Sequence, residues 1–225
     1  MYRDYQRATQ IINEIVESVP DYCKGDELKT FTYIYVTIAQ RLRYNDYAAE
    51  LIGRKLVGYE RERAEDSVIQ PASTIECLIW GRALCTGYAE VLKAILERLK
   101  IPTIIVRTKG DHAWNQVKIN GKWYNCDLTN DADFILDGLK CPHFLTSNED
   151  DYNFHVRYPT SYFENCNETI SEELQEQLIK EADDFIKLEK RKKQIKLEEE
   201  AIQEKPGFIK RLFYHFKSKE GVKRI

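Results

Sequence analysis

Residues 81–131 decide the fold of this chain, and they read GRALCTGYAEVLKAILERLKIPTIIVRTKGDHAWNQVKINGKWYNCDLTND. Apolar side chains recur every three to four residues from Cys85 to Leu99, which predicts a helix that Pro102 brings to an end. The apolar period then changes to two, as in a strand. The sequence therefore predicts a helix that begins at or beside Cys85, followed by strands over 103–107, 113–119 and 122–128.

The dipeptide Asn120–Gly121 is a strong signal for a β-hairpin. A two-residue loop at this dipeptide pairs Ile119 with Lys122 and gives the ribbon one mainly apolar face that would pack on a core. The other face carries His112, Trp114, Gln116, Asn125 and Asp127. On that face His112 lies diagonal to Asp127, with Cβ atoms roughly 7–8 Å apart, so the carboxylate can reach and orient the imidazole.

The chain before this core is predicted to be helical. Residues 2–19 and 27–43 carry apolar side chains at helical spacing, and Tyr47–Gly58 is a predicted third helix. Residues 61–73 are polar and contain Pro71, which predicts a connection. Helices therefore come first and an antiparallel sheet follows, which is the order of an α+β fold.

The chain after the hairpin is predicted to contain one more short strand, over 143–146, and then a change of composition to Glu and Lys from Ser171 onward. A helical apolar stripe in this segment fades around residues 190–193. We expect three parts: a main α+β domain that contains the candidate catalytic residues, a charged helical extension and a basic amphipathic tail, over 1–170, 171–204 and 205–225.

Composition places the chain among soluble globular proteins, with 43% apolar and 12% aromatic residues in 225. No apolar run approaches the roughly 20 residues that cross a bilayer, and the first residues predict an amphipathic helix rather than a signal peptide. The six cysteines are irregularly spaced, which indicates free thiols in a reducing compartment. We therefore expect a cytoplasmic protein.

Charge is distributed unevenly along the chain. Residues 205–225 hold seven Lys and Arg against one acidic residue, a net charge of +6. Because the whole chain has a net charge of −3, residues 1–204 have a net charge of −9. An acidic body disfavours nucleic acid as a partner, because phosphate contacts need a basic face. Within 206–217 five apolar side chains share one helical arc, so we expect this segment to contact an anionic membrane, a partner groove or the acidic body itself.

Cys85 is the candidate nucleophile. A thiol at a helix N-terminus meets the positive end of the helix dipole and unpaired backbone N–H groups, which lower its pKa. The small residues around it, Gly81, Ala83 and Gly87 among them, allow a substrate backbone to approach, and the main-chain N–H of Cys85 can donate to an oxyanion. With His112 as base and Asp127 as orienter, the chain carries the three roles of a catalytic triad.

The segments GRALCTGYAEVLKAILERLKIP and GDHAWNQVKINGKWYNCDLTND resemble the catalytic core of the transglutaminase-like superfamily. In that family a Gly-x-x-Cys-x-Gly-Tyr-Ala helix start supplies the nucleophile, a His-Ala-Trp strand supplies the base, and an Asp in the next strand completes the triad. The resemblance assigns these roles to Cys85, His112 and Asp127. It covers about residues 30–158, and it departs from the family at Asn130, where many relatives have an aromatic residue.

The resemblance implies a papain-like α+β fold and a thioester formed from a protein or peptide amide, whose acyl group passes to an amine or to water. Some relatives are inactive, so the rival hypothesis is an inactive module that binds protein partners through the same cleft. We expect no cofactor and no metal, because calcium belongs to the large animal enzymes and no loop with EF-hand spacing occurs here.

Several assignments stay open at the level of sequence. Asp131 takes the place of Asp127 if the hairpin register slips. A zinc site would use Cys126, Cys141 and His143, but the spacing of these residues lacks the paired motifs of zinc sites. A second oxyanion donor is not identified, and His155 matches a family position where an accessory or structural role is expected. The candidates for the donor are Tyr44, Gln70 and Trp80.

Overall fold

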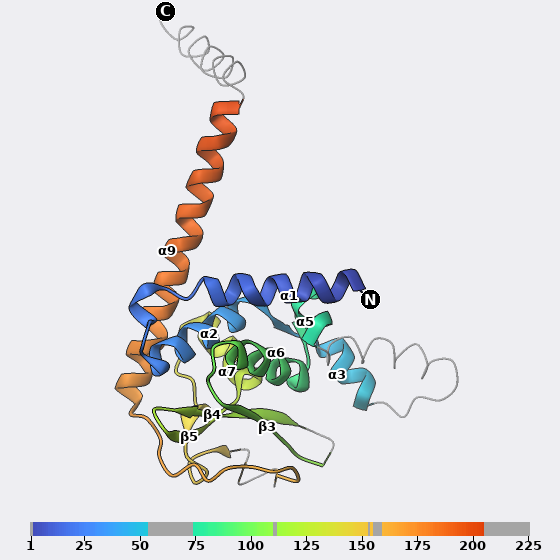
Figure 1. Ribbon diagram of the computed structural model, residues 1–225. Helices are drawn as coiled ribbons and strands as arrows, with labels where there is room; N and C mark the ends of the chain where they lie inside the picture. The colour runs from blue at the N-terminus through green and yellow to red at the C-terminus, as the bar shows by residue number, and fades with distance from the viewer. Residues whose placement is uncertain (1, 54–73, 110–111, 153, 155–158, 205–225) are drawn as a thin grey trace, which may run out of the picture. The chain divides into compact units, whose positions relative to one another are not determined.

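The computed structural model describes residues 2–53, 74–109, 112–152, 154 and 159–204 (Figure 1). The described helices are α1 (Tyr2–Glu17), η1 (Asp21–Cys23), α2 (Glu27–Arg41), α3 (Asp46–Gly53), α5 (Thr74–Trp80), α6 (Cys85–Arg98), α7 (Leu128–Asp137) and α9 (Glu172–Glu204). The described strands are β1 (Arg43–Tyr44), β2 (Arg82–Ala83), β3 (Thr103–Arg107), β4 (Ala113–Ile119), β5 (Lys122–Cys126) and β6 (Phe144–Thr146). Among these helices, none is both long and apolar enough to cross a bilayer.

Contacts divide the chain into two compact units, residues 1–183 and 184–225. The division falls inside α9, whereas the sequence places a domain boundary near residue 170, just before this helix begins at Glu172. The described part of the second unit is the remainder of α9, a helix of charged and largely exposed residues. The tail over 205–225 lies outside the described residues.

The first unit combines helices with an antiparallel sheet, as an α+β fold requires. Its four strands are ordered β3–β4–β5–β6, and every neighbouring pair is antiparallel. The hairpin register is the predicted one, with Ile119 paired with Lys122. Asn120 and Gly121 both have positive φ angles, 50° and 83°, which a type I′ turn requires at its two central residues.

Helix α6, which begins at Cys85, packs directly on this sheet. Helix α6 contacts β3 and β4 through a buried apolar face, as the helical period predicts. Helix α2 contacts α6 and α7, while α1 contacts α5 and α6. Figure 1 shows the sheet on one side of α2, α6 and α7, and α1 on their far side. The core thus fixes the start of α6 against the strand that follows His112.

A second, two-stranded sheet lies just before helix α6. Strands β1 and β2 are parallel, and Tyr44 pairs with Ala83, two residues before Cys85. Between α5 and β2 the chain turns at Gly81, which has a φ angle of +68° and where a Cβ atom would lie 3.3 Å from the carbonyl oxygen of Arg41. This turn needs glycine both for its left-handed backbone and for the close approach of α2.

The polar face of the hairpin is buried as well as the apolar face. Gln116 and Asn125 are fully buried, and the chain around Glu164 supplies hydrogen-bond partners for Gln116. The Gln116 amide donates to the Glu164 carbonyl at 3.1 Å and accepts from the Glu164 backbone N–H at 2.7 Å. The chain around Glu164 therefore covers the face of the sheet that carries His112 and Asp127.

Two predictions about elements need correction. The strand predicted over 122–128 ends at Cys126, because Asp127 caps α7 and Leu128 begins that helix. Helix α5 occupies Thr74–Trp80, where no element was predicted. The predicted third helix is described as far as Gly53, and the connection over 61–73 lies outside the described residues.

Candidate active site

A cleft of about 640 Å³ opens at the N-terminus of α6. Residues from three parts of the first unit line it: the β1–α3 junction, the start of α6 with His112, and the first turns of α7. The lining residues are Arg43, Tyr44, Asp46, Cys85, His112, Thr129, Asn130, Asp133 and Phe134. The structure thus brings Cys85 and His112 together in one cleft.

Cys85 is the first residue of α6 and is partly exposed. The residue before it, Leu84, caps the helix without a side-chain hydrogen bond. Burial raises the pKa of the Cys85 thiol, but the hydrogen bond to His112 and the imidazolium charge more than offset burial, with help from backbone groups of Ala113 and Thr86, so the net direction is downward. The arrangement favours a thiolate.

His112 is held in place through its ring and along its backbone. The His112 N–H donates to Thr108 Oγ1 at 3.0 Å, and the Thr108 N–H donates to the His112 carbonyl at 3.1 Å. The imidazole stacks on the Trp114 ring, with centroids 6.0 Å apart and planes 21° from parallel. Burial alone would lower the pKa of His112, but its hydrogen bonds to Asp127 and Cys85 raise it to about 9.

Asp127 is fully buried and accepts hydrogen bonds at both carboxylate oxygens. Its Oδ1 accepts from the backbone N–H groups of Thr129 and Asn130, at 3.1 and 3.4 Å, as the N-cap of α7. Its Oδ2 lies 2.6 Å from His112 Nε2 and 2.7 Å from Asn130 Nδ2. With Nε2 engaged by Asp127, Nδ1 is the ring nitrogen available to Cys85.

Cys85 differs from every other cysteine of the chain in two respects. The other five are buried, whereas Cys85 is partly exposed. Burial raises the pKa of each buried thiol, to about 11 for Cys23 and about 12 for Cys77 and Cys166, and also upward for Cys126 and Cys141. A nucleophilic thiolate near neutral pH is therefore expected at Cys85 alone.

Asp131 does not take the place of Asp127. Its carboxylate accepts from Tyr35 Oη at 2.9 Å and from the His143 backbone N–H at 3.1 Å. Burial raises the pKa of Asp131 to about 7, and the hydrogen bonds to Tyr35 and the His143 backbone make this side chain an acceptor within the core. The carboxylate that contacts His112 is Asp127.

The structure also bears on the zinc site and on the candidate oxyanion donors. His143 Nδ1 lies 3.8 Å from Asp151 Oδ2, and across the described residues no group of three His, Cys, Asp or Glu side chains is arranged to hold a metal ion. Trp80 is 67% exposed and donates its indole N–H to Glu76 in its own helix, away from the cleft lining. Tyr44 lines the cleft, while Gln70 and His155 lie outside the described residues.

Among the lining residues that the sequence did not predict, Asn130 is the one that contacts Asp127 through its side chain. Its side chain reaches the same carboxylate oxygen as His112, and it also lines the cleft. The signal was present, because Asp127 is followed by apolar residues at helical spacing, Leu128, Ala132 and Ile135. A helix capped by Asp127 places the side chain of its third residue beside the cap.

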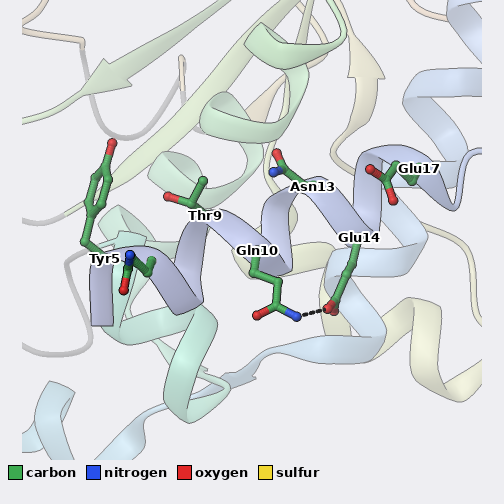
Figure 2. A pocket seen from close by; sticks show the side chains of 7 residues that line it. Tyr5, Thr9, Gln10, Asn13, Glu14 and Glu17 are labelled. Atoms are coloured by element: carbon green, nitrogen blue, oxygen red, sulfur yellow. Dashed lines mark hydrogen bonds between the residues drawn. The ribbon is translucent and has the colours of Figure 1, made fainter. Parts of the chain in front are cut away.

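A second hollow, of about 540 Å³, runs along the outer face of α1. Figure 2 shows that polar side chains of this one helix line it and that Gln10 donates to Glu14, at 2.8 Å. The lining residues are Tyr5, Gln6, Thr9, Gln10, Asn13, Glu14 and Glu17. They include no nucleophile or base of the kind found at Cys85, so the candidate active site is the cleft at α6.

Known proteins offer little for comparison. No family model matches the chain, and no curated protein matches it. The chain is similar to a solved structure described as "Crystal structure of a TGase", with a TM-score of 0.46 and 16% identity. The match covers 56% of this chain and 32% of that chain, so the chain spans about a third of that protein. A similarity of this size is too weak to establish an activity.

Proposed function

We propose that this chain is a cysteine-dependent enzyme of the transglutaminase-like type, with a papain-like core, that transfers the acyl group of a protein or peptide amide to an amine or to water. One observation supports the proposal above all. The Cys85 thiol, whose pKa is lowered, lies in the same cleft as His112, and His112 is hydrogen-bonded to Asp127. A nucleophile, a base and an orienter are thereby in mutual reach.

In the first half of the proposed reaction, the Cys85 thiolate attacks the amide carbonyl carbon and forms a C–S bond. The His112 imidazolium gives its proton to the leaving nitrogen as the C–N bond breaks, which leaves a thioester and a free amine or ammonia. Asp127 stays ionised and fixes the imidazole through Nε2. The raised pKa of His112 keeps this proton available near neutral pH.

In the second half, an amine or water attacks the thioester carbonyl while neutral His112 accepts its proton. The C–S bond then breaks and the thiolate returns, with imidazolium beside it. The developing oxyanion needs donors, and the main-chain N–H of Cys85 at the helix start is the first candidate. The Tyr44 hydroxyl is the second, because Tyr44 lines the cleft from β1.

An electrophilic glutamine mimic tests the proposal, since it needs a working nucleophile but no knowledge of the natural substrate. We expect one label per chain, mapped to the peptide that contains Cys85. Labelling is lost in Cys85→Ala, falls by orders of magnitude in His112→Ala, and is unchanged in His215→Ala, a matched histidine control in the tail. Mass spectrometry of peptides treated with and without a primary amine then separates deamidation, transamidation and chain cleavage.

The competing function is an inactive module that binds protein partners through the same cleft. It predicts no labelling by the mimic in the wild-type chain, even though the protein is folded. Melting curves of all the variants keep the two apart, because a loss of labelling without any loss of folding is attributable to the chemistry of the cleft.

A further inference from the structure

Asn130 occupies an unusual position in the site. It is the third residue of α7, it is partly exposed, and it lines the cleft. Its amide Nδ2 donates to Asp127 Oδ2 at 2.7 Å. The same oxygen lies 2.6 Å from His112 Nε2, so one carboxylate oxygen receives both side chains.

The two oxygens of Asp127 are held in different ways. Oδ1 is held by backbone N–H groups at the start of α7, which come with any helix capped by an aspartate. Oδ2 is held by the side chains of His112 and Asn130. Without the Asn130 amide, the carboxylate would keep its anchor at Oδ1 and could pivot about that end, carrying the imidazole with it.

Asn130 also occupies the place from which a water molecule would otherwise donate a hydrogen bond to Asp127 Oδ2. Asp127 is fully buried, whereas Asn130 is partly exposed and faces the cleft. A neutral amide donor at this place satisfies Oδ2 without neutralising the carboxylate, and its geometry is fixed by the helix. A water molecule can donate to the same oxygen but does not fix its direction as tightly.

We propose that Asn130 is a positioning residue: it holds Asp127 Oδ2 toward His112 and thereby sets how strongly His112 stabilises the Cys85 thiolate. The inference rests on the proposed function, in which Cys85 is the nucleophile. It gives Asn130 no contact with the reacting atoms and assigns its effect to the orientation of the His–Asp pair.

Two substitutions of Asn130 in the full chain separate the effect of its hydrogen bond to Asp127 from the effect of its packing. Asn130→Leu keeps the branched four-atom shape of the side chain but replaces the amide atoms with bulkier methyl groups, so it removes the donor and leaves no room for water. Asn130→Ala also removes the donor but leaves room for water to replace it. The readout is the pH dependence of Cys85 alkylation by iodoacetamide, and Leu136→Ala on the exposed side of α7 is the control for general disturbance of the helix.

We expect Asn130→Leu to shift the alkylation midpoint of Cys85 upward by about one pH unit, so that labelling below the midpoint slows roughly tenfold. Asn130→Ala should shift it less, and Leu136→Ala should not shift it. Melting temperatures should stay close to wild type in all three, because the helix N-cap at Asp127 Oδ1 is retained.

A purely packing role predicts the opposite order, with Asn130→Ala more harmful than Asn130→Leu and a loss of stability in step with the shift. That order would overturn the inference. Alkylation midpoints that stay unchanged in both Asn130 variants would overturn it too. In either case an acidic Cys85 thiol in the wild type would leave the proposed function intact. An ordinary wild-type thiol, with a midpoint near about 8.5, would overturn the proposed function together with the inference.

Discussion

At the residue scale, Asp127 carries two tasks with one side chain. Oδ1 caps α7 and Oδ2 orients His112, so the start of a structural helix and the base of the candidate site share a carboxylate. The two tasks respond differently to substitution. Asparagine is as good an N-cap as aspartate, whereas alanine is not a cap at all.

We therefore expect Asp127→Asn to keep the fold and to slow acyl transfer by roughly 10⁴-fold, because an amide facing His112 Nε2 favours the wrong imidazole tautomer. Asp127→Ala should be as slow and should also unfold about 1 kcal/mol more easily through the lost cap. Turnover on a small amide and chemical denaturation measure the two effects. Near-normal turnover in Asp127→Asn would contradict the role of this carboxylate.

His112 makes the stability of the fold depend on pH. Its pKa is raised to about 9 in the folded chain, above the ordinary value of 6.5, so its proton stabilises the fold fully below about pH 6.5. That contribution is lost as pH rises through about 9. A Cys85→Ser background removes both the titration of the thiol and its share of the shift, and leaves Asp127 to raise the pKa of His112. In that background the melting temperature should exceed that of Cys85→Ser/His112→Gln most near pH 6. A margin that grows toward pH 10 would contradict the assignment.

At the scale of helices and strands, the sequence predicts the features that are determined by neighbouring residues. The Asn120–Gly121 turn sets the hairpin register, and the apolar period from Cys85 places the start of α6. Helix α7 was not predicted because residues 122–128 also alternate as a strand does, and this alternation conceals the helical spacing of Leu128, Ala132 and Ile135. The contact between Asn130 and Asp127 was not predicted for the same reason, because it forms only if Asp127 caps a helix.

The turn at Gly81 precedes β2 and helix α6, so we expect it to set the position of the start of α6. Gly81 and Gly138 both have φ angles of +68°, but a Cβ atom at Gly81 would lie 3.3 Å from the Arg41 carbonyl oxygen, whereas one at Gly138 would meet nothing within 4 Å. Gly138→Ala should cost about 1 kcal/mol from backbone strain alone, and Gly81→Ala should cost about 2–3 kcal/mol. Denaturant unfolding of both variants measures the difference.

Labelling by the glutamine mimic provides the second readout for these glycines. We expect slower labelling of Cys85 in Gly81→Ala, because β2 and the start of α6 must shift away from α2, and unchanged labelling in Gly138→Ala. Equal costs and equal labelling rates in the two variants would show that the close approach at Gly81 does not position Cys85.

At the scale of the whole molecule, charge separates the tail from the body. Residues 205–225 carry a net +6, and their sequence places five apolar residues at helical spacing: Phe208, Ile209, Leu212, Phe213 and Phe216. We predict that the full chain co-sediments with anionic liposomes, with roughly 1 kcal/mol for each basic residue near the surface, and that salt weakens the binding. A chain ending at Glu204 should not bind, and its turnover on a small soluble amide should be unchanged.

The competing possibility for the tail is that it folds back on the acidic body. It predicts a lower melting temperature after truncation, because apolar surface would be uncovered. Liposome binding and melting temperature are therefore measured on the same pair of chains. A drop in melting temperature without liposome binding by the full chain would contradict the membrane prediction.

If His112 makes Cys85 an acidic nucleophile, the pH dependence of iodoacetamide alkylation with peptide mapping shows it most directly. We predict that Cys85 reacts well below the ordinary thiol pKa of about 8.5, that the five buried cysteines stay unmodified in the folded chain, and that His112→Ala moves the Cys85 midpoint up toward about 8.5. A wild-type midpoint already at about 8.5, unchanged in His112→Ala, would show that His112 does not acidify Cys85.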